Sequence, residues 1–369
     1  MPRRSIVFLG LYTLFLCRII SAAELPWIAV SADKRGFVRD DATPFRPWGF
    51  NYDHDEQGRL LEDYWDAEWS KVADDFAEMK MLGANVVRVH LQFGKFMERP
   101  DRPRRAALER LKKLLALAAS TELYLDVTGL GCYHKADVPA WYDALTDDER
   151  WAAQAVFWEA VARTCADSSA VFCYDLMNEP LAPAGDGKSG DWLGPAFGGK
   201  HFVQRIALRQ GERVRHDIAR AWIARMADAI RAVDRRHLIT VGLVDWSLDR
   251  PGLTSGFVPD KVAERLDFVA VHLYPESGKT DDAVKTLQAF AVGKPVIVEE
   301  TFPLKCTPDE LGAFMDRTQD DAAGWIGFYW GKTPEDLRKS RKPEDALQLG
   351  WLEVFLARGK FRKSAFRPE

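Results

Sequence analysis

The chain has 369 residues, of which 47% are hydrophobic and 29% are charged. Its 51 lysines and arginines against 55 aspartates and glutamates give a formal net charge of −4 at pH 7. Because no basic stripe accompanies this balance, nucleic acid is excluded as a partner class. The length suits one large α/β domain with long loops.

The first 23 residues have the pattern of an export signal. Two arginines give a basic start, residues 6–17 are almost wholly apolar, and small side chains precede a cleavage point at Ala23. We therefore expect a secreted or periplasmic protein in which residues 24–369 form a single domain. A membrane anchor is the alternative, but Arg18 interrupts the apolar stretch, and no later segment reaches the roughly 20 apolar residues of a span.

Four cysteines remain beyond this segment: Cys132, Cys165, Cys173 and Cys306. An exported chain permits disulfides. Cys165 and Cys173 flank a predicted turn from helix to strand, so this pair is the candidate disulfide. No cysteine or histidine cluster has the spacing of metal ligands, and we expect neither a metal nor a cofactor.

Strand and helix signals alternate along the rest of the chain. Residues 27–38 form a possible hairpin that precedes the first strand. The candidate strands are short apolar stretches at 45–52, 85–91, 123–128, 170–177, 238–244, 267–273, 295–300 and 324–330. The candidate helices follow them at 69–82, 105–120, 147–164, 203–233, 259–265, 281–290, 308–321 and 346–357, the fourth of them broken near Gly211.

Eight strands, each followed by a helix, predict an α/β protein with a closed parallel sheet, the (β/α)8 TIM barrel. The strands are apolar on both faces, as expected when helices cover the outside and side chains fill the inside. The N-terminal hairpin would then plug the floor of the barrel. A loop rich in glycine and proline, at residues 181–201, is the longest of the βα loops.

Polar side chains gather at the predicted C-terminal strand ends, where barrels of this kind carry their working residues. The candidates are Arg88 and His90, Asn178 and Glu179, His272 and Tyr274, Glu299 and Glu300, and Trp330. Residues 53–55 (Asp-His-Asp) resemble a metal site, but three sequence neighbours rarely converge on one ion.

Two of these strands run out into carboxylates, at Glu179 and at Glu300. A buried strand that ends in a carboxylate is costly unless the group is paired or has a function. Two such ends suggest paired carboxylates, which suit cleavage of a glycosidic bond. Strand alternation sends Glu299 and Glu300 to opposite faces, and Glu299 is expected to point away from the cleft.

Several segments together resemble glycoside hydrolase family 5, the cellulase-like retaining β-glycosidases of clan A. They are GFNYD, GANVVRVH, YDLMNEP, VAVHLYP, KPVIVEET and GWIGFYWG, and the resemblance covers roughly residues 36–356. It implies a β-glycosidase acting as a monomer on a carbohydrate, with β-1,4-glucan or β-mannan as the expected substrates. The alternatives are an inactive carbohydrate-binding barrel, and a barrel lyase or aldolase whose lysine, metal or phosphate loop is missing here.

The resemblance also implies a role for each site residue. Glu179 matches the acid/base and Glu300 the nucleophile. The other matches are Asn178 on the sugar 2-hydroxyl, Arg88 supporting the nucleophile and lowering its pKa, His272 and Tyr274 beside the carboxylates, and Trp330 under the sugar. His90 either lines the site or is a hydrogen-bonded core histidine. One departure is Thr128, where many members have a histidine that His134 could replace.

Overall fold

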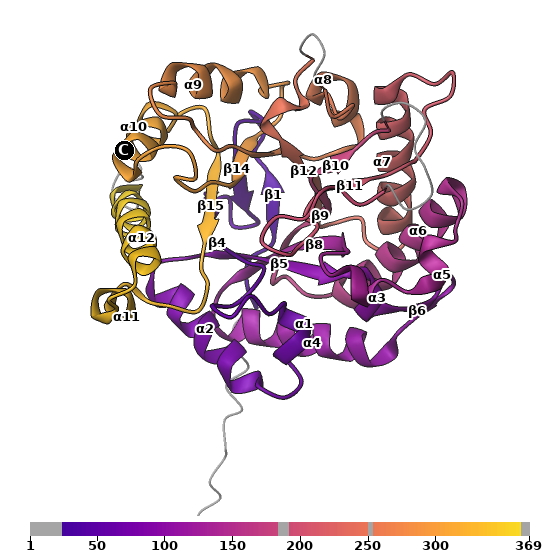
Figure 1. Cartoon of the computed structure of the whole chain (residues 1–369), viewed down its shortest axis with the longest axis horizontal. Helices are drawn as coiled ribbons and strands as arrows, with labels where there is room; N and C mark the ends of the chain where they lie inside the picture. The colour runs from indigo at the N-terminus through magenta and orange to yellow at the C-terminus, as the bar shows by residue number, and fades with distance from the viewer. Residues whose placement is uncertain (1–23, 184–191, 250–253, 363–369) are drawn as a thin grey trace, which may run out of the picture.

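The computed structural model describes residues 24–183, 192–249 and 254–362. The predicted export signal lies outside these ranges. Eight parallel strands form a closed barrel at the centre of the molecule (Figure 1). They are β4 (Trp48–Tyr52), β5 (Val86–Gln92), β8 (Tyr124–Gly131), β9 (Val171–Asn178), β12 (Leu238–Val244), β13 (Val269–His272), β14 (Val296–Glu300) and β15 (Gly324–Phe328).

The ring closes where β15 pairs with β4, with Trp325 opposite Trp48. This closure confirms the predicted (β/α)8 barrel. Each barrel strand is buried along nearly its whole length, because helices cover its outer face and side chains fill the inside. Gly49 shows how closely the strands approach: a Cβ atom there would lie 1.7 Å from the carbonyl oxygen of Val86 on β5.

Helices surround the barrel (Figure 1). The outer helices are α2 (Trp69–Met81), α4 (Arg105–Ser120), α6 (Asp147–Cys165), α7 (Arg215–Arg231), α8 (Pro259–Val262), α9 (Thr280–Ala289), α10 (Pro308–Arg317) and α12 (Pro343–Arg362). Shorter helices lie in the loops: α1 (Leu61–Tyr64), α3 (Phe93–Phe96), α5 (Ala140–Asp143) and α11 (Pro334–Lys339). Among the described helices, none is both long and apolar enough to cross a membrane.

The N-terminal segment closes the floor of the barrel. It forms a three-stranded antiparallel sheet, β1 (Ile28–Val30), β2 (Phe37–Arg39) and β3 (Pro44–Phe45), one strand more than the expected hairpin. Phe37 and Phe45 pack against Phe172, with ring centroids 5.1 and 5.7 Å away. This apolar cluster includes the first residues of several barrel strands, so the opposite, C-terminal end is the open one.

The helix expected at 203–233 begins only at Arg215. The residues before it are not helical, and two of them form backbone hydrogen bonds with the long loop after β9. Arg205 N donates to Trp192 O at 2.6 Å, and Ile206 N donates to Leu181 O at 2.9 Å. Gly211 has a positive φ of 59°, which a helix does not allow. Tertiary hydrogen bonds therefore outweigh the helical periodicity of this stretch.

The candidate disulfide between Cys165 and Cys173 does not form: all four described cysteines are free. Cys165 packs with Tyr174 in the core between barrel and helices, whereas Cys173 lies in the cluster inside the barrel. Cys173 and Tyr174 are consecutive on β9, and consecutive strand residues point to opposite faces. A cysteine that contacts one of them cannot reach the other.

Candidate active site

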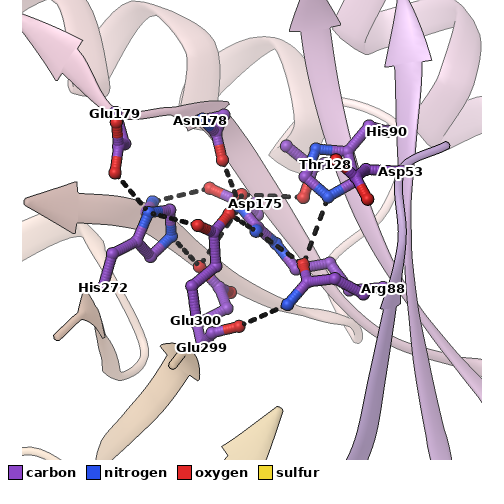
Figure 2. A network of polar contacts seen from close by, with 12 residues as sticks. Asp53, Arg88, His90, Thr128, Asp175, Asn178, Glu179, His272, Glu299 and Glu300 are labelled. Carbon is purple, nitrogen blue, oxygen red and sulfur yellow. Dashed lines mark hydrogen bonds and ion pairs between the residues drawn. The ribbon is translucent and has the colours of Figure 1, made fainter. Parts of the chain in front are cut away.

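Arg88 is the centre of a polar network inside the barrel. It lies on β5 with no exposed surface, and side chains from β4, β9 and β14 point toward it (Figure 2). Its Nη1 donates to Glu300 Oε1 at 2.6 Å and to Asn51 Oδ1 at 2.9 Å. Its Nη2 donates to Asp175 Oδ2 at 2.6 Å and to Asn178 Oδ1 at 3.1 Å. One rigid cation therefore fixes side chains of three other strands.

His272, at the end of β13, lies between three carboxylates (Figure 2). Its Nδ1 is 3.0 Å from Glu179 Oε1 and 3.5 Å from Glu300 Oε2, and its Nε2 is 3.2 Å from Glu299 Oε2. Burial opposes the charged ring, but the negative charge of Glu300 and hydrogen bonds to the other two glutamates raise the pKa of His272 to about 10. At neutral pH the ring is an imidazolium that donates from both nitrogens.

Glu300 has a separate donor for each carboxylate oxygen. Arg88 donates to Oε1, and the Tyr274 hydroxyl donates to Oε2 at 2.6 Å. Burial raises the pKa of Glu300 and Glu179 raises it too, against the lowering effect of His272 and Arg88; the net pKa shift is upward. Arg88 lowers the pKa of Glu300, as expected, but burial raises it by more.

Glu179 occupies a strained position directly after β9. Its backbone has a φ of 46°, in the left-handed region that few side chains adopt. Its N–H donates to Gly242 O at 3.0 Å on the neighbouring β12, which helps to hold this turn. The side chain is 17% exposed, more than that of Glu300, and accepts the hydrogen bond from His272.

The two glutamates that the sequence singled out lie close together. A carboxylate oxygen of Glu179, Nδ1 of His272 and a carboxylate oxygen of Glu300 all lie within 4.8 Å of one another. A separation this short is typical of retaining glycosidases, whose two carboxyl groups lie about 5 to 5.5 Å apart. It is below the roughly 6.5–9.5 Å of inverting enzymes, which hold a water molecule between the sugar and one of the two groups.

Glu179, His272 and Glu300 have the spacing of metal ligands, but a metal ion would have to displace the Nδ1 proton of the His272 imidazolium. The acids at residues 53–55 do not converge on one point. Asp53 accepts from His54 at 2.8 Å, and Asp55 pairs with Arg59 at 2.7 Å.

The sequence profile described as "Cellulase (glycosyl hydrolase family 5)" matches residues 47–333. The chain belongs to this family. Among curated relatives, it is 23% identical over 239 residues to mannan endo-1,4-β-mannosidase A of Aspergillus aculeatus, covering 58% of this chain and 55% of that one. The chain thus spans about half the length of this relative.

Solved structures share the barrel. An exo-β-1,4-mannosidase from Opitutaceae bacterium strain TAV5 superposes with a TM-score of 0.67 at 16% identity, over 91% of this chain and 62% of that one. The endo-1,4-β-mannanase of Rhizomucor miehei has a TM-score of 0.62 at 19% identity, over 90% of this chain and 99% of that one. At such identities the likeness establishes the fold alone.

Beneath the glutamates lies a layer of buried acids, of which only Glu299 was singled out from the sequence. Asp126, Asp175 and Glu299 have no exposed surface. Asp175 accepts from Thr128 Oγ1 at 2.8 Å and from Gly242 N at 2.7 Å. Burial and the charge of Glu299 hold the pKa of Asp126 well above its usual range, so Asp126 stays protonated. The signal that could have revealed Asp126 is its place inside an otherwise apolar strand, opposite Arg88 in the register of β5 and β8.

Glu299 lies behind Glu300, away from solvent, and contacts His272 and Arg88. Arg88 and His272 overcome burial and hold the pKa of Glu299 below its usual value. Glu299 is therefore an anion that neutralises the two buried cations. Glu299 is buried behind the cleft, as expected, but it does not point to the opposite face from Glu300. Both side chains contact His272 and Arg88, and the register between β13 and β14 shifts beside them.

His90 is 3% exposed, and both ring nitrogens have partners. Nε2 lies 3.2 Å from Asn51 Oδ1, and Nδ1 lies 2.5 Å from the hydroxyl of Tyr133. Burial and the charge of Arg88 hold the pKa of His90 well below its usual value, so the ring is neutral. Thr128, where many family 5 members carry histidine, binds Asp175. Tyr133, which sequence reasoning missed, reaches His90, whereas no hydrogen bond joins its neighbour His134 to a described site residue.

Trp330 follows β15 and packs between His54 and Phe302, with ring centroids 5.8 and 5.4 Å away. It lines a cavity of about 700 Å³ at this end of the barrel. Trp192, in the long loop after β9, is buried. Its Nε1 donates to Asp143 Oδ1 at 2.9 Å, so it holds the loop together.

Proposed function

We propose that this family 5 member is an exported retaining glycoside hydrolase that cleaves β-1,4-linked mannan or glucan. The observation that carries the proposal is the pair Glu179 and Glu300, with carboxylate oxygens within 4.8 Å of each other. Retaining enzymes need this spacing, because one carboxylate attacks the anomeric carbon while the other carboxyl group protonates the glycosidic oxygen.

In the proposed first step, a carboxylate oxygen of Glu300 attacks the anomeric carbon while Glu179 gives a proton to the leaving oxygen. Hydrogen bonds from Arg88 and Tyr274 hold the nucleophile in one orientation. Such positioning removes much of the entropic barrier to attack. The product is a covalent ester between the sugar and Glu300.

In the second step Glu179 acts as the base. Esterification removes the negative charge of Glu300. Glu179, having lost its proton, then takes one from a water molecule that attacks the anomeric carbon and releases the Glu300 carboxylate. The imidazolium of His272 lies beside both carboxylates throughout and donates from Nδ1. It stabilises whichever of the two is ionised.

The remaining family residues would position the sugar. Asn178 points its Oδ1 to Arg88, while its Nδ2 donates to Phe202 O at 3.0 Å; we assign it to the 2-hydroxyl. Trp330 would supply a flat apolar face for the C–H side of the ring. The mannan-degrading relatives from Aspergillus and tomato support a mannan-type substrate. Residues 1–23 would direct export, and the enzyme would act as a monomer.

Azide rescue separates the two glutamates. With a dinitrophenyl glycoside, Glu179→Ala should form the intermediate and stall, and added azide should restore turnover as the β-glycosyl azide. Glu300→Ala should give the α-azide. Glu109→Ala, on the exposed side of α4, is the matched control and should behave as the unmodified enzyme.

A panel of mannan, β-glucan and xylan, with reducing sugar and product sizes measured, identifies the substrate. Full activity of Glu179→Ala on a natural polymer would refute the acid/base assignment. Polysaccharide binding without any release of reducing sugar would instead support the alternative of an inactive carbohydrate-binding barrel.

A further inference from the structure

A hollow beside Trp330 extends away from the buried network. Its volume is about 700 Å³, and its walls come from the loops after β4, β14 and β15, from the start of α12, and from a turn at residues 197–200. In Figure 1, α12 and the ends of β14 and β15 lie on one side of the barrel. If one sugar unit stacks on Trp330, the next unit of the chain would therefore lie in this hollow.

Lys200 lies in the wall of the hollow, with most of its side chain buried. The residue is 7% exposed, and its ammonium lies beside Gly58, where a Cβ atom would be 3.3 Å from Nζ. A tight turn presents it: Phe197 and Lys200 exchange backbone hydrogen bonds of 2.8 and 3.0 Å. Gly198 and Gly199 both have a positive φ, which the turn requires. Lys200 is therefore rigidly placed.

The ammonium of Lys200 has no hydrogen bond or ion pair with any residue in the described ranges. Three of the acids that line the hollow have other cations: Asp55 pairs with Arg59 at 2.7 Å, Glu56 with Lys71 at 3.3 Å, and Asp345 with Lys332 at 2.8 Å. Glu344, which also lines the hollow, is exposed to solvent. The hollow thus contains a fixed positive charge that a ligand can neutralise.

The rim of the hollow favours a sugar ring. Leu347 lines it and is 69% exposed, while Phe197 and Leu304, each next to a lining residue, are 67% and 52% exposed. These exposed apolar side chains are available to contact a ligand in the hollow. Their flat or branched faces can contact the C–H side of a sugar, and Lys200 can contact a substituent of that sugar.

We propose that this hollow binds a sugar unit carrying a carboxylate, adjacent to the unit at the cleavage point, and that Lys200 recognises the carboxylate. The inference rests on the proposed hydrolase function and narrows its substrate to an acidic β-linked glycan. Neutral sugars offer only hydroxyls, which do not neutralise the charge of the ammonium. A carboxylate supplies the missing charge and accepts charge-assisted hydrogen bonds.

The test compares manno-oligosaccharides with the same chains oxidised at C6 to carboxylates. At low salt we expect the enzyme to favour the oxidised chains about tenfold in kcat/KM, with the preference falling as salt rises. Lys200→Met should abolish the preference, and Lys200→Arg should retain most of it. Lys342→Met, which removes an exposed lysine of the same wall, is the matched control and should change it little.

Binding of both chains is also measured by calorimetry in a Glu300→Gln background, where the chains stay intact. Loss of the tighter binding of oxidised chains in Lys200→Met supports the inference even if neither chain is hydrolysed, which would refute only the proposed function. An unchanged preference in Lys200→Met, or equal binding of both chains by the protein with Lys200 intact, overturns the inference. Neither result affects the proposed hydrolase function. Thermal unfolding verifies that each variant is folded.

Discussion

Replacing Arg88 with methionine should destabilise the protein in a pH-dependent way. The substitution keeps the volume of the side chain but leaves Asp175 and Glu300, each paired at 2.6 Å, without their cation. Breaking a buried pair in this way costs about 3 to 5 kcal/mol. For a chain of this length, an entropy of unfolding of about 2 cal/mol/K per residue converts that loss into a fall in Tm of roughly 4 to 7 °C.

The pH dependence follows from the carboxyl groups. The pKa values of Asp175 and Glu300 already lie above their usual values because of burial, and loss of Arg88 raises them further. A group whose folded pKa is raised destabilises the fold as pH rises above its unfolded pKa, near 4. The loss in Arg88→Met should therefore be larger at pH 8 than at pH 5.

Thermal unfolding at pH 5 and pH 8 measures this effect. Arg150→Met is the matched control, because Arg150 is 1% exposed but its nearest carboxylate, on Asp147, is 3.7 Å away and partly exposed. It should lose stability through packing, with little dependence on pH. Equal destabilisation of Arg88→Met at both pH values would refute the reasoning.

Three further predictions concern other parts of the molecule. Because the pKa of His272 is about 10, its 15N ring signals should be those of an imidazolium at pH 7, and the stability it contributes should be full below pH 6.5 and lost as pH rises through 10; a neutral ring at pH 7 would contradict this. Gly49→Ala should prevent soluble expression, because its Cβ would overlap Val86 O; a well-folded variant with an unchanged Tm would be inconsistent with the strand packing. Of the four described cysteines, only Cys306 is partly exposed, so a thiol reagent should modify it first in the native protein, and simultaneous reaction of the others would show that the core opens.

Much of the fold was predictable because local and tertiary preferences agree. The helix at Arg105–Ser120 and the strand at Leu238–Val244 have the predicted bounds, since apolar periodicity and burial coincide there. The stretch before Arg215 was not predictable, because its backbone bonds to Leu181 and Trp192, which are distant in sequence. Local periodicity contains no information about such partners.

The same distinction applies to the site. Glu179 and Glu300 stand at strand ends with recognisable neighbours, so their proximity could be predicted from the barrel. Asp126 and Asp175 lie inside strands, where an acid is indistinguishable from a surface residue until the register with Arg88 is known. Lys200 depends on a turn in a long loop, whose path no periodicity specifies.

The backbone of Glu179 has a consequence for protein engineering. A residue other than glycine at a φ of 46° stores of order 1 kcal/mol or more of strain, which persists because the site requires it. Glycine at this position would relieve the strain and remove the carboxylate that we propose as the acid/base, so any gain in thermal resistance would come with loss of the proposed catalysis. A library screened for heat tolerance alone would therefore be enriched in dead enzymes at this codon, and selection has to couple survival on heating to sugar release.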